Sequence, residues 1–481
     1  MSSEAKRILF LFLGLVPIFL FYFLPQFSPA VDPSGKVFEL PKAGQSAIGL
    51  FLLAGVWWVF EVIPIGVTSL AIGMLQPIFG IRPAGDAFRD FMDPTVMFIL
   101  GSLIVGLTFS KCGLTKRIAY RTLVLVGEDT RLIMLGVFII TALLTHIMAH
   151  TAVAATMFPI LLAIVALYGE GEKPTRFGKG LFIGMAYTAG AGSMCTMLGG
   201  ARNPAAVGFY KEFTGGDISF MDFSLHLLPM GWLIVFLCWI LVLVIFKPEK
   251  TKILGLRETA ADLYKQLGPM TRQEIFVMFV VALALLMLVL QAAVPSLKGL
   301  DRSIPMLVAG LIFFITRILT VHDLEKMIPW NIVLLFSGAM SIGFALWKTG
   351  AAQWMAVNWL SMLQNAPWLV VVLGIAFLVL IMTNFIMNVA AIAIVLPVAL
   401  VIAQYLGVNP EIILYSATAA AAMPMLLLIG AAPNAIAYES KQFTTGEFFM
   451  AGIPGSLMVL AVTVLFIFTY WPLIGLSPLM K

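Results

Sequence analysis

Two matching stretches of sequence decide the fold, and they read Thr145-His146-Ile147-Met148-Ala149-His150-Thr151-Ala152 and Thr383-Asn384-Phe385-Ile386-Met387-Asn388-Val389-Ala390. Each places polar residues inside a long apolar run, which then continues to a proline, Pro159 in the first case and Pro397 in the second. The stretches and the prolines stand at one constant offset, which indicates an internal repeat. Each interrupted run is too long for one membrane span, so we expect residues 131–168 and 368–405 to fold back as re-entrant hairpins.

A second pair of breaks lies downstream of the hairpins, at Gly199-Gly200-Ala201-Arg202-Asn203-Pro204 and at Gly430-Ala431-Ala432-Pro433-Asn434-Ala435. Glycine and proline interrupt helices, so each break is expected to split an apolar helix within the membrane. Secondary transporters build their sites from such discontinuous helices at the interface between repeats. Four breaks in two matched pairs therefore predict one binding site at membrane depth.

The composition is that of a membrane protein. Of the 481 residues, 61% are hydrophobic and only 11% are charged, whereas a soluble domain carries about 25% charged residues. The net charge of +5 is better explained by cytoplasmic Lys and Arg than by a nucleic-acid partner. The three cysteines form no CxxC pair, and the sequence contains no HExxH helix, GxSxG elbow or phosphate-binding glycine loop, so neither a zinc site nor an enzyme is expected.

The apolar runs predict an all-α polytopic membrane protein with about 11 transmembrane helices in addition to the two re-entrant hairpins. With a cytoplasmic N-terminus, most Lys and Arg fall on the cytoplasmic side, as the positive-inside rule requires, and the C-terminus is extracytoplasmic. The hairpins then enter from opposite sides, so the repeats are inverted. Amphipathic pieces are expected at 114–127 and 351–363, and a charged linker at 247–272. The predicted spans are 8–24, 46–62, 66–79, 95–109, 182–198, 227–246, 275–294, 304–319, 332–346, 412–429 and 448–471.

The breaks carry groups that suit an anion with carboxylates. A helix that starts inside the membrane exposes free backbone N–H groups, and its dipole favours negative charge. Thr151, Asn203, Asn388 and Asn434 add hydroxyl and amide groups that can hydrogen-bond a carboxylate. Arg202 adds a cation, which costs about 2.5–3.5 kcal/mol to insert into a membrane and is therefore a functional candidate. A guanidinium can hold a carboxylate through two parallel hydrogen bonds.

The sequence resembles the divalent-anion/sodium symporter family, the INDY-type dicarboxylate and citrate carriers, over nearly its whole length. The resemblance is carried by Trp57-Trp58-Val59-Phe60-Glu61-Val62-Ile63-Pro64 with Val67-Thr68-Ser69-Leu70, and by Gly430-Ala431-Ala432-Pro433-Asn434-Ala435-Ile436-Ala437. It implies an ion-transporter-superfamily-like elevator fold and a homodimer in the cell membrane. It also implies a scaffold domain at 1–130 and 247–366, the latter including a linker helix, and a transport domain at 131–246 and 367–481.

In that family each hairpin tip carries Ser-Asn-Thr, which contacts substrate carboxylates and helps to form a sodium site. Here the first tip reads Ala149-His150-Thr151 and the second reads Met387-Asn388-Val389, so side-chain oxygens are lost. We infer that Arg202, together with His150, supplies the positive charge that sodium supplies in relatives. The altered tips resemble a sodium-independent exchanger branch, because a fixed cation is costly to move across the membrane unless an anion neutralises it.

The sequence therefore predicts a secondary transporter that exchanges di- or tricarboxylates such as succinate, malate, fumarate or 2-oxoglutarate. Sodium-coupled dicarboxylate symport is the alternative within transporters, and an anion channel is the alternative from a different class. The expected partners are this substrate, membrane lipids and a second copy of the chain, with no cofactor. The expected substrate-binding residues are Ala149, His150, Thr151, Gly200, Arg202, Asn203, Met387, Asn388, Val389, Ala432, Pro433 and Asn434. Remnants of a sodium site are expected at Thr145, Gly199, Thr383, Asn388 and Gly430.

Overall fold

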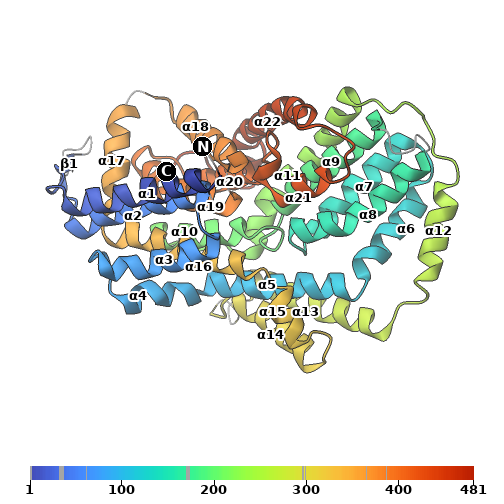
Figure 1. The fold of residues 1–481 in the computed structure, drawn as a ribbon, viewed down its shortest axis with the longest axis horizontal. Coiled ribbons are helices and arrows are strands. Elements are labelled where there is room, and N and C mark those ends of the chain that lie inside the picture. Colours follow the sequence, from blue (N-terminus) through green and yellow to red (C-terminus); the bar gives the residue numbers. More distant parts are fainter. Residues whose placement is uncertain are drawn as a thin grey trace.

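The computed structural model describes residues 3–31, 37–60, 62–168, 174–294, 297, 299–363, 366–385 and 387–480. Apart from a ribbon of β1 (Ala30–Val31) and β2 (Val37–Phe38), the described elements are helices (Figure 1). The first half contains α1 (Ser3–Phe23), α2 (Lys42–Val59), α3 (Ile65–Ile78), α4 (Ala84–Arg89), η1 (Asp90–Met92), α5 (Pro94–Lys111), α6 (Leu114–Val126), α7 (Thr130–Thr145), α8 (His150–Tyr168), α9 (Arg176–Ser193), α10 (Arg202–Thr214) and α11 (Phe220–Ile245). The second contains α12 (Leu256–Gln266), α13 (Arg272–Ala293), α14 (Ser303–Ile315), α15 (Val321–Lys326), α16 (Trp330–Lys348), α17 (Ala351–Leu363), α18 (Trp368–Phe385), α19 (Asn388–Tyr405), α20 (Pro410–Ala421), η3 (Leu428–Gly430), α21 (Ala432–Tyr438), α22 (Thr445–Phe468) and α23 (Tyr470–Leu473).

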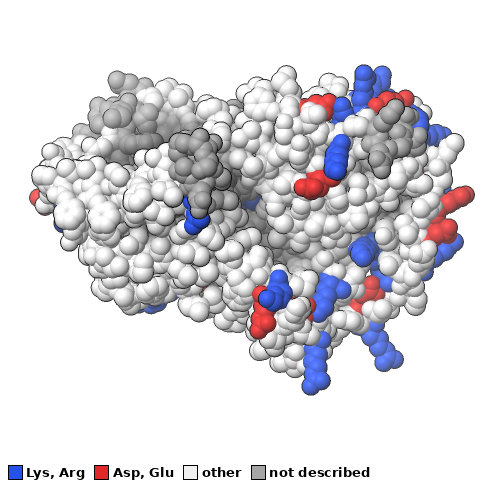
Figure 2. All heavy atoms as spheres, in the orientation of Figure 1, with Lys and Arg blue, Asp and Glu red and all other residues white. Residues whose placement is uncertain are grey.

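The described helices are those of a protein that crosses a membrane many times. Seven helical segments are long and apolar enough to span a bilayer, and five shorter apolar helices accompany them. The molecule is elongated, with α1 to α4 and α17 at one end and α6, α7, α8 and α12 at the other (Figure 1). Figure 2 shows charged side chains gathered toward the second end and almost none on the visible face of the first. The all-α polytopic fold expected from the sequence is confirmed.

Both hairpins form where the sequence predicts them. Helices α7 and α8 contact each other and enclose a turn after Thr145, and α18 and α19, which end at Phe385 and begin at Asn388, also contact each other. His150 and Asn388, which stand at equivalent repeat positions, are each the first residue of the second limb. The second limb of each hairpin therefore begins at a tip that the sequence marks with polar residues.

Both split helices end earlier than the sequence predicts. Helix α9 ends at Ser193 and α20 ends at Ala421, whereas the apolar runs extend to 198 and 429. The unwound segments, 194–201 and 422–431, are rich in Met, Cys and Leu, so their composition does not distinguish them from helix. The sequence-based boundaries at these two positions are wrong because apolar residues were counted as helical.

Two short helices, one from each half, pack against the opposite half of the chain. Helix α10, which follows the first break, packs on α19 and α20 of the second half. Helix α21, which follows the second break, packs in return on α8 and α9 of the first half. The helix after the first break therefore lies against the second hairpin, and the helix after the second break lies against the first hairpin.

The connecting segments contain helices that the sequence did not predict. These are the short helices α4 and α15, which precede two spans. The charged linker forms α12, where the family resemblance implies a linker helix, and α12 packs on the amphipathic α6. Buried or partly buried ion pairs then tie the first 130 residues to residues 247–366. Arg117 of α6 donates through Nε to Oε1 of Glu274 over 2.9 Å, and Lys111 pairs with Asp323.

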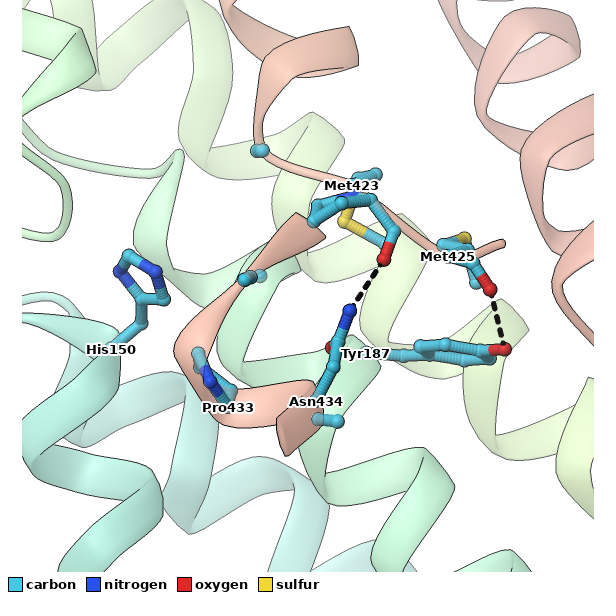
Figure 3. A pocket seen from close by; sticks show the side chains of 11 residues that line it. His150, Tyr187, Met423, Met425, Pro433 and Asn434 are labelled. Carbon is cyan, nitrogen blue, oxygen red and sulfur yellow. Dashed lines mark hydrogen bonds between the residues drawn. The ribbon is translucent and has the colours of Figure 1, made fainter. Parts of the chain in front are cut away.

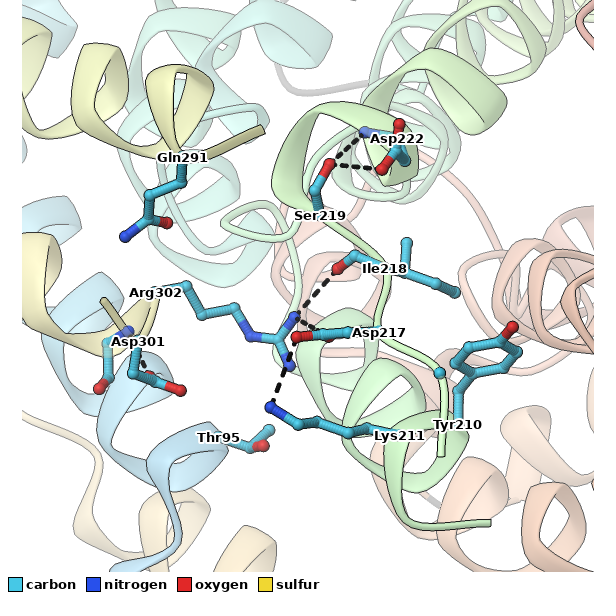
Figure 4. Close-up of polar contacts among 12 residues, drawn as sticks. Thr95, Tyr210, Lys211, Asp217, Ile218, Ser219, Asp222, Gln291, Asp301 and Arg302 are labelled. Carbon is cyan, nitrogen blue, oxygen red and sulfur yellow. Dashed lines mark hydrogen bonds and ion pairs between the residues drawn. The ribbon is translucent and has the colours of Figure 1, made fainter. Parts of the chain in front are cut away.

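A separate set of contacts ties the loop between α10 and α11 to the beginning of α14. Arg302 donates to the carbonyl oxygen of Ile218 over 3.1 Å and lies 3.5 Å from the Asp217 carboxylate (Figure 4). Lys211 lies 3.4 Å from the same carboxylate, and Lys348 pairs with Glu212 at 2.7 Å. These contacts hold the end of α10 against α14 and α16.

The pair of Lys111 and Asp323 predicts a pH-dependent contribution to stability. The Lys111 ammonium holds the pKa of the buried Asp323 carboxyl at about 2, below its ordinary value of 3.8. Because the folded pKa is lowered, the contribution is present above about pH 4 and is lost as the pH falls toward 2. We expect Asp323→Asn to lower the free energy of unfolding by about 1.5–3 kcal/mol, whereas Glu325→Gln, exposed on the same helix, changes little. Thermal unfolding at pH 7 checks this, and equal melting temperatures for Asp323→Asn and the unaltered protein would contradict it.

Candidate functional site

A small pocket lies where the first hairpin tip meets the second break. His150 approaches it from α8, Tyr187 from α9, and Pro433 and Asn434 from α21 (Figure 3). Its volume is about 10 Å³, which is room for one water molecule, so the junction is closed in this structure. The residues that line it are His150, Ala186, Tyr187, Gly190, Ala422, Met423, Pro424, Met425, Ala431, Pro433 and Asn434.

Two helices begin at this pocket, namely α8 at His150 and α21 at Ala432. The first backbone N–H groups of a helix have no partner within it, and the helix dipole adds positive potential there. One ring nitrogen of His150, Nδ1, is buried and has no hydrogen-bond partner among the described residues. The pocket is therefore lined by groups that favour an anion.

Asn203 and Asn434 occupy equivalent places in the two breaks and make the same pair of hydrogen bonds. Asn203 Nδ2 donates to the carbonyl oxygens of Ser193 at 2.8 Å and Thr196 at 2.6 Å. Asn434 Nδ2 donates to those of Pro424 at 2.7 Å and Leu427 at 3.2 Å. These bonds hold the unwound backbone in place. Both amide nitrogens, which we expected to donate to a substrate carboxylate, therefore donate to backbone carbonyls instead.

Arg202 is the first residue of α10 and is 1% exposed. Its Nη2 donates to Ser193 Oγ over 2.7 Å, its Nε is buried without a partner, and no carboxylate among the described residues pairs with it. A cation at a helix N-terminus is opposed by the dipole, and an unpaired buried charge is costly. Ser193 Oγ in turn donates to the carbonyl oxygen of Gly190, which lines the pocket, so Arg202 lies close to the pocket. An anion bound next to Arg202 would compensate this buried charge.

The residues expected as remnants of a sodium site form two oxygen-rich clusters. A side chain at Gly199 would lie 2.4 Å from the Thr145 carbonyl oxygen, and one at Gly430 would lie 2.7 Å from that of Thr383, so glycine is required at both places. Thr383 Oγ1 also donates to Asn388 Oδ1 at 2.8 Å and to the Ala421 carbonyl at 3.1 Å. Each hairpin tip is thus closely packed on the break of its own half.

The structure brings some of the expected substrate-binding residues together and leaves others apart. His150, Pro433 and Asn434 line the pocket, and Arg202 stands beside it. The second tip does not line it, because α19 packs on α10 instead. The residues outside the pocket lining are Ala149, Thr151, Gly200, Arg202, Asn203, Met387, Asn388, Val389 and Ala432.

Sequence reasoning missed three residues that shape this region. Tyr187 lines the pocket and donates through its hydroxyl to the carbonyls of Met425 and Phe448, both at 3.1 Å. Ser193 accepts from Arg202, and Asn384 Oδ1 accepts from the backbone N–H groups of residues 426 and 427. Only Asn384 carries a signal in the sequence, since it stands inside the polar tip of the second hairpin.

Comparison with known families assigns the chain. Residues 8–477 match the family model described as the sodium:sulfate symporter transmembrane region. The chain belongs to the sodium:sulfate symporter family. Its membership makes it a multi-pass membrane transporter rather than an enzyme, as the sequence analysis expects. Of the segment Trp57–Pro64 that carries the resemblance, Glu61 lies outside the residues that the structure describes.

Curated relatives in the family align with the chain over most of its length. The sodium-dependent dicarboxylate transporter SdcS of Staphylococcus saprophyticus is 26% identical over 461 residues, which cover 91% of this chain and 88% of that protein. The sodium-dependent high-affinity dicarboxylate transporter 3 of Caenorhabditis elegans is 26% identical over 460 residues, with 86% and 81% covered.

Two solved structures share the fold. MtrF of Neisseria gonorrhoeae superposes with a TM-score of 0.59 at 14% identity, and covers 96% of this chain and 93% of its own. The YdaH transporter of Alcanivorax borkumensis superposes with a TM-score of 0.55 at 13% identity over 99% of both chains. At these identities the likeness concerns the fold alone, and it agrees with a multi-span arrangement of helices and hairpins.

Proposed function

We propose that the chain is a secondary active transporter of dicarboxylates across the cytoplasmic membrane. The observation that carries this proposal is Arg202, a buried cation with no carboxylate partner in the described part of the chain, which lies beside a pocket where two helices begin. A substrate carboxylate would neutralise the guanidinium and accept from the first N–H groups of α8 and from the N–H of Ala432 at the start of α21, where Pro433 has no N–H. The names of the relatives, which are dicarboxylate transporters, support the same class of substrate.

Sodium coupling is the mode of transport that the relatives favour, since both are named as sodium-dependent. The second half retains oxygens that suit it, because Thr383 Oγ1 lies within hydrogen-bond distance of both Asn388 Oδ1 and the Ala421 carbonyl. In the first half, Asn203 Oδ1 is a buried acceptor without a partner. Unwound carbonyls and the ends of half-helices bind sodium in other transporters. We therefore propose sodium-coupled symport as the mode of transport, in preference to the exchange that the sequence alone favours.

Exchange without sodium is the second candidate, and Arg202 is the specific observation in its favour. Its guanidinium is buried, so the empty carrier retains a fixed cation at membrane depth. Such a carrier would cross its barrier readily only when an anion is bound. The two modes give different results in one transport assay.

We also propose an elevator movement of residues 131–246 and 367–481 against a scaffold of residues 1–130 and 247–366 in a homodimer. Contacts within each group support this division, whereas the pairs of Arg302 with Asp217 and of Lys348 with Glu212 cross it and would have to separate during the movement. Arg117 with Glu274 and Lys111 with Asp323 join the two scaffold segments. Lys179 pairs with Glu447, and Tyr187 bonds to Met425 and Phe448, which joins the two transport segments. The proposal includes a cytoplasmic N-terminus and an extracytoplasmic C-terminus.

The test is uptake of labelled succinate into proteoliposomes, with a sodium or a choline gradient and with empty or succinate-loaded vesicles. Sodium-coupled symport predicts uptake into empty vesicles only when sodium is outside. Exchange predicts uptake into loaded vesicles that is indifferent to sodium. Absence of uptake in all four conditions, with sulfate and citrate tested in parallel, would overturn dicarboxylate transport.

Sodium coupling predicts the effect of Thr383→Val. The substitution removes a hydroxyl oxygen that contacts Asn388 and Ala421 while conserving volume, so the sodium concentration for half-maximal uptake should rise about tenfold, equivalent to about 1.4 kcal/mol. The control is Thr141→Val, whose buried hydroxyl bonds only to the carbonyl of Val137 in its own helix. An unchanged sodium dependence in Thr383→Val would remove this cluster from the sodium site.

A further inference from the structure

A second cavity, of about 150 Å³, lies between the amphipathic helices α6 and α12 and the second limb of the first hairpin, α8. Helix α6 contributes Lys116 and Tyr120, α8 contributes Thr156 and Leu167, and α12 contributes Leu263. Leu167 is 40% exposed on an apolar helix long enough to span the membrane, so the cavity opens toward lipid. It is separate from the pocket at the hairpin tip.

An equivalent cavity occurs in the second half. It has a volume of about 420 Å³ and lies between Met355 of α17 and the hairpin limbs α18 and α19. Ile394 and Ile402 of α19 line it, and they occupy the repeat positions of Thr156 and Ile164 of α8, which line the first cavity. Both cavities therefore lie beside the second hairpin limb and the amphipathic helix of their own half, although their remaining walls come from different elements.

The two cavities differ in charge. The cavity of the second half is lined by apolar side chains and Gly374. The first has the exposed ammonium of Lys116 at its rim. Among the described residues, Arg117 of the same helix pairs with Glu274, whereas Lys116 has no ion pair. Figure 2 shows Lys and Arg side chains together with Asp and Glu along the edge of the molecule that α6 and α12 form, so Lys116 is distinguished by its place at the cavity and not by a wholly basic surface.

We propose that the cavity of the first half binds an anionic phospholipid. One acyl chain occupies the apolar space between α8 and α12, and the phosphate pairs with Lys116. Amphipathic helices lie at the membrane interface, which is the depth at which lipid phosphates are found. A nearby Lys or Arg favours an anionic over a neutral lipid about fivefold. This site does not depend on the substrate or on the mode of transport.

The test is photo-crosslinking of the full-length protein with phosphatidylglycerol or phosphatidylcholine that carries a diazirine in one acyl chain, followed by peptide mapping. We expect phosphatidylglycerol to label the α8 segment around Ala163 and Leu167 about fivefold more than phosphatidylcholine does. Lys116→Gln removes this preference and Lys116→Arg retains it. The matched control, Arg121→Gln, removes an exposed charge from the same helix outside the cavity and retains the preference.

A further variant tests the acyl chain. Ala163→Phe places a ring in the cavity and should lower labelling of α8 by both lipids at least severalfold. Equal labelling by the two lipids in the unaltered protein would overturn the proposal. Equal losses in Lys116→Gln and Arg121→Gln would also overturn it, because they would show a general surface attraction instead of a site.

Discussion

Arg202→Gln is expected to raise the dicarboxylate concentration for half-maximal transport about 100-fold. The substitution removes the buried guanidinium and keeps a side chain that can still bond to Ser193 Oγ. A hydrogen bond to a charged group contributes about 1.5–3 kcal/mol, and about 2.8 kcal/mol corresponds to two decades in affinity. Concentration-dependent uptake of labelled succinate into proteoliposomes measures the change.

Two variants separate substrate binding from a structural role of Arg202. Ser193→Ala removes the hydroxyl that holds the guanidinium and leaves the charge in place, so it is expected to have a much smaller effect. Arg202→Lys keeps a cation and should restore part of the affinity, without the bidentate geometry. If Ser193→Ala were as damaging as Arg202→Gln, Arg202 would serve the backbone of the break and not the substrate.

Asn434→Asp is expected to abolish transport and to lower the free energy of unfolding by about 3 kcal/mol. The amide nitrogen of Asn434 donates to the carbonyls of Pro424 and Leu427, and a carboxylate in its place would face both oxygens without a proton. The new negative charge would also repel an anion in the adjoining pocket. Because Asn203 makes the equivalent bonds, Asn203→Asp should change stability in the same direction.

The matched control for this prediction is Asn409→Asp. Asn409 caps α20 by accepting from the backbone N–H of Glu411, and aspartate caps a helix equally well. The charge change is the same, but the oxygen that makes the contact is retained. Uptake and thermal unfolding of Asn434→Asp, Asn203→Asp and Asn409→Asp test this prediction. A fully active, stable Asn434→Asp protein would show that the Asn434 amide is not needed to hold the unwound backbone.

The hairpins could be predicted from the sequence because their boundaries are chemical contrasts. Polar residues interrupt apolar runs at Thr145 and Thr383, and the described helices α7, α8, α18 and α19 end or begin within a few residues of them. The predicted amphipathic segments 114–127 and 351–363 likewise coincide with α6 and α17, and in α6 polar and apolar residues alternate with a helical period. Contrast in polarity along the chain is the signal that sequence reasoning reads well.

The ends of the split helices and the contacts across the repeats could not be predicted in this way. The unwound residues after Ser193 and Ala421 are as apolar as the helices before them, and their backbone is held by Asn203 and Asn434 from seven to ten residues downstream. Hydrogen bonds of that kind depend on the fold of the loop. The packing of α10 and α21 on the opposite halves is likewise determined by tertiary contacts, which leave no periodic pattern in the sequence.

The central claim is that the first hairpin tip and the second break, with Arg202 beside them, form the dicarboxylate site. A structure determined by cryo-electron microscopy with succinate and sodium present tests it most directly. The account predicts density for succinate between His150 and Ala432–Asn434, in contact with the Arg202 guanidinium, in a junction opened well beyond its present volume of about 10 Å³. Succinate bound elsewhere in the molecule, with this junction still closed, would contradict the account.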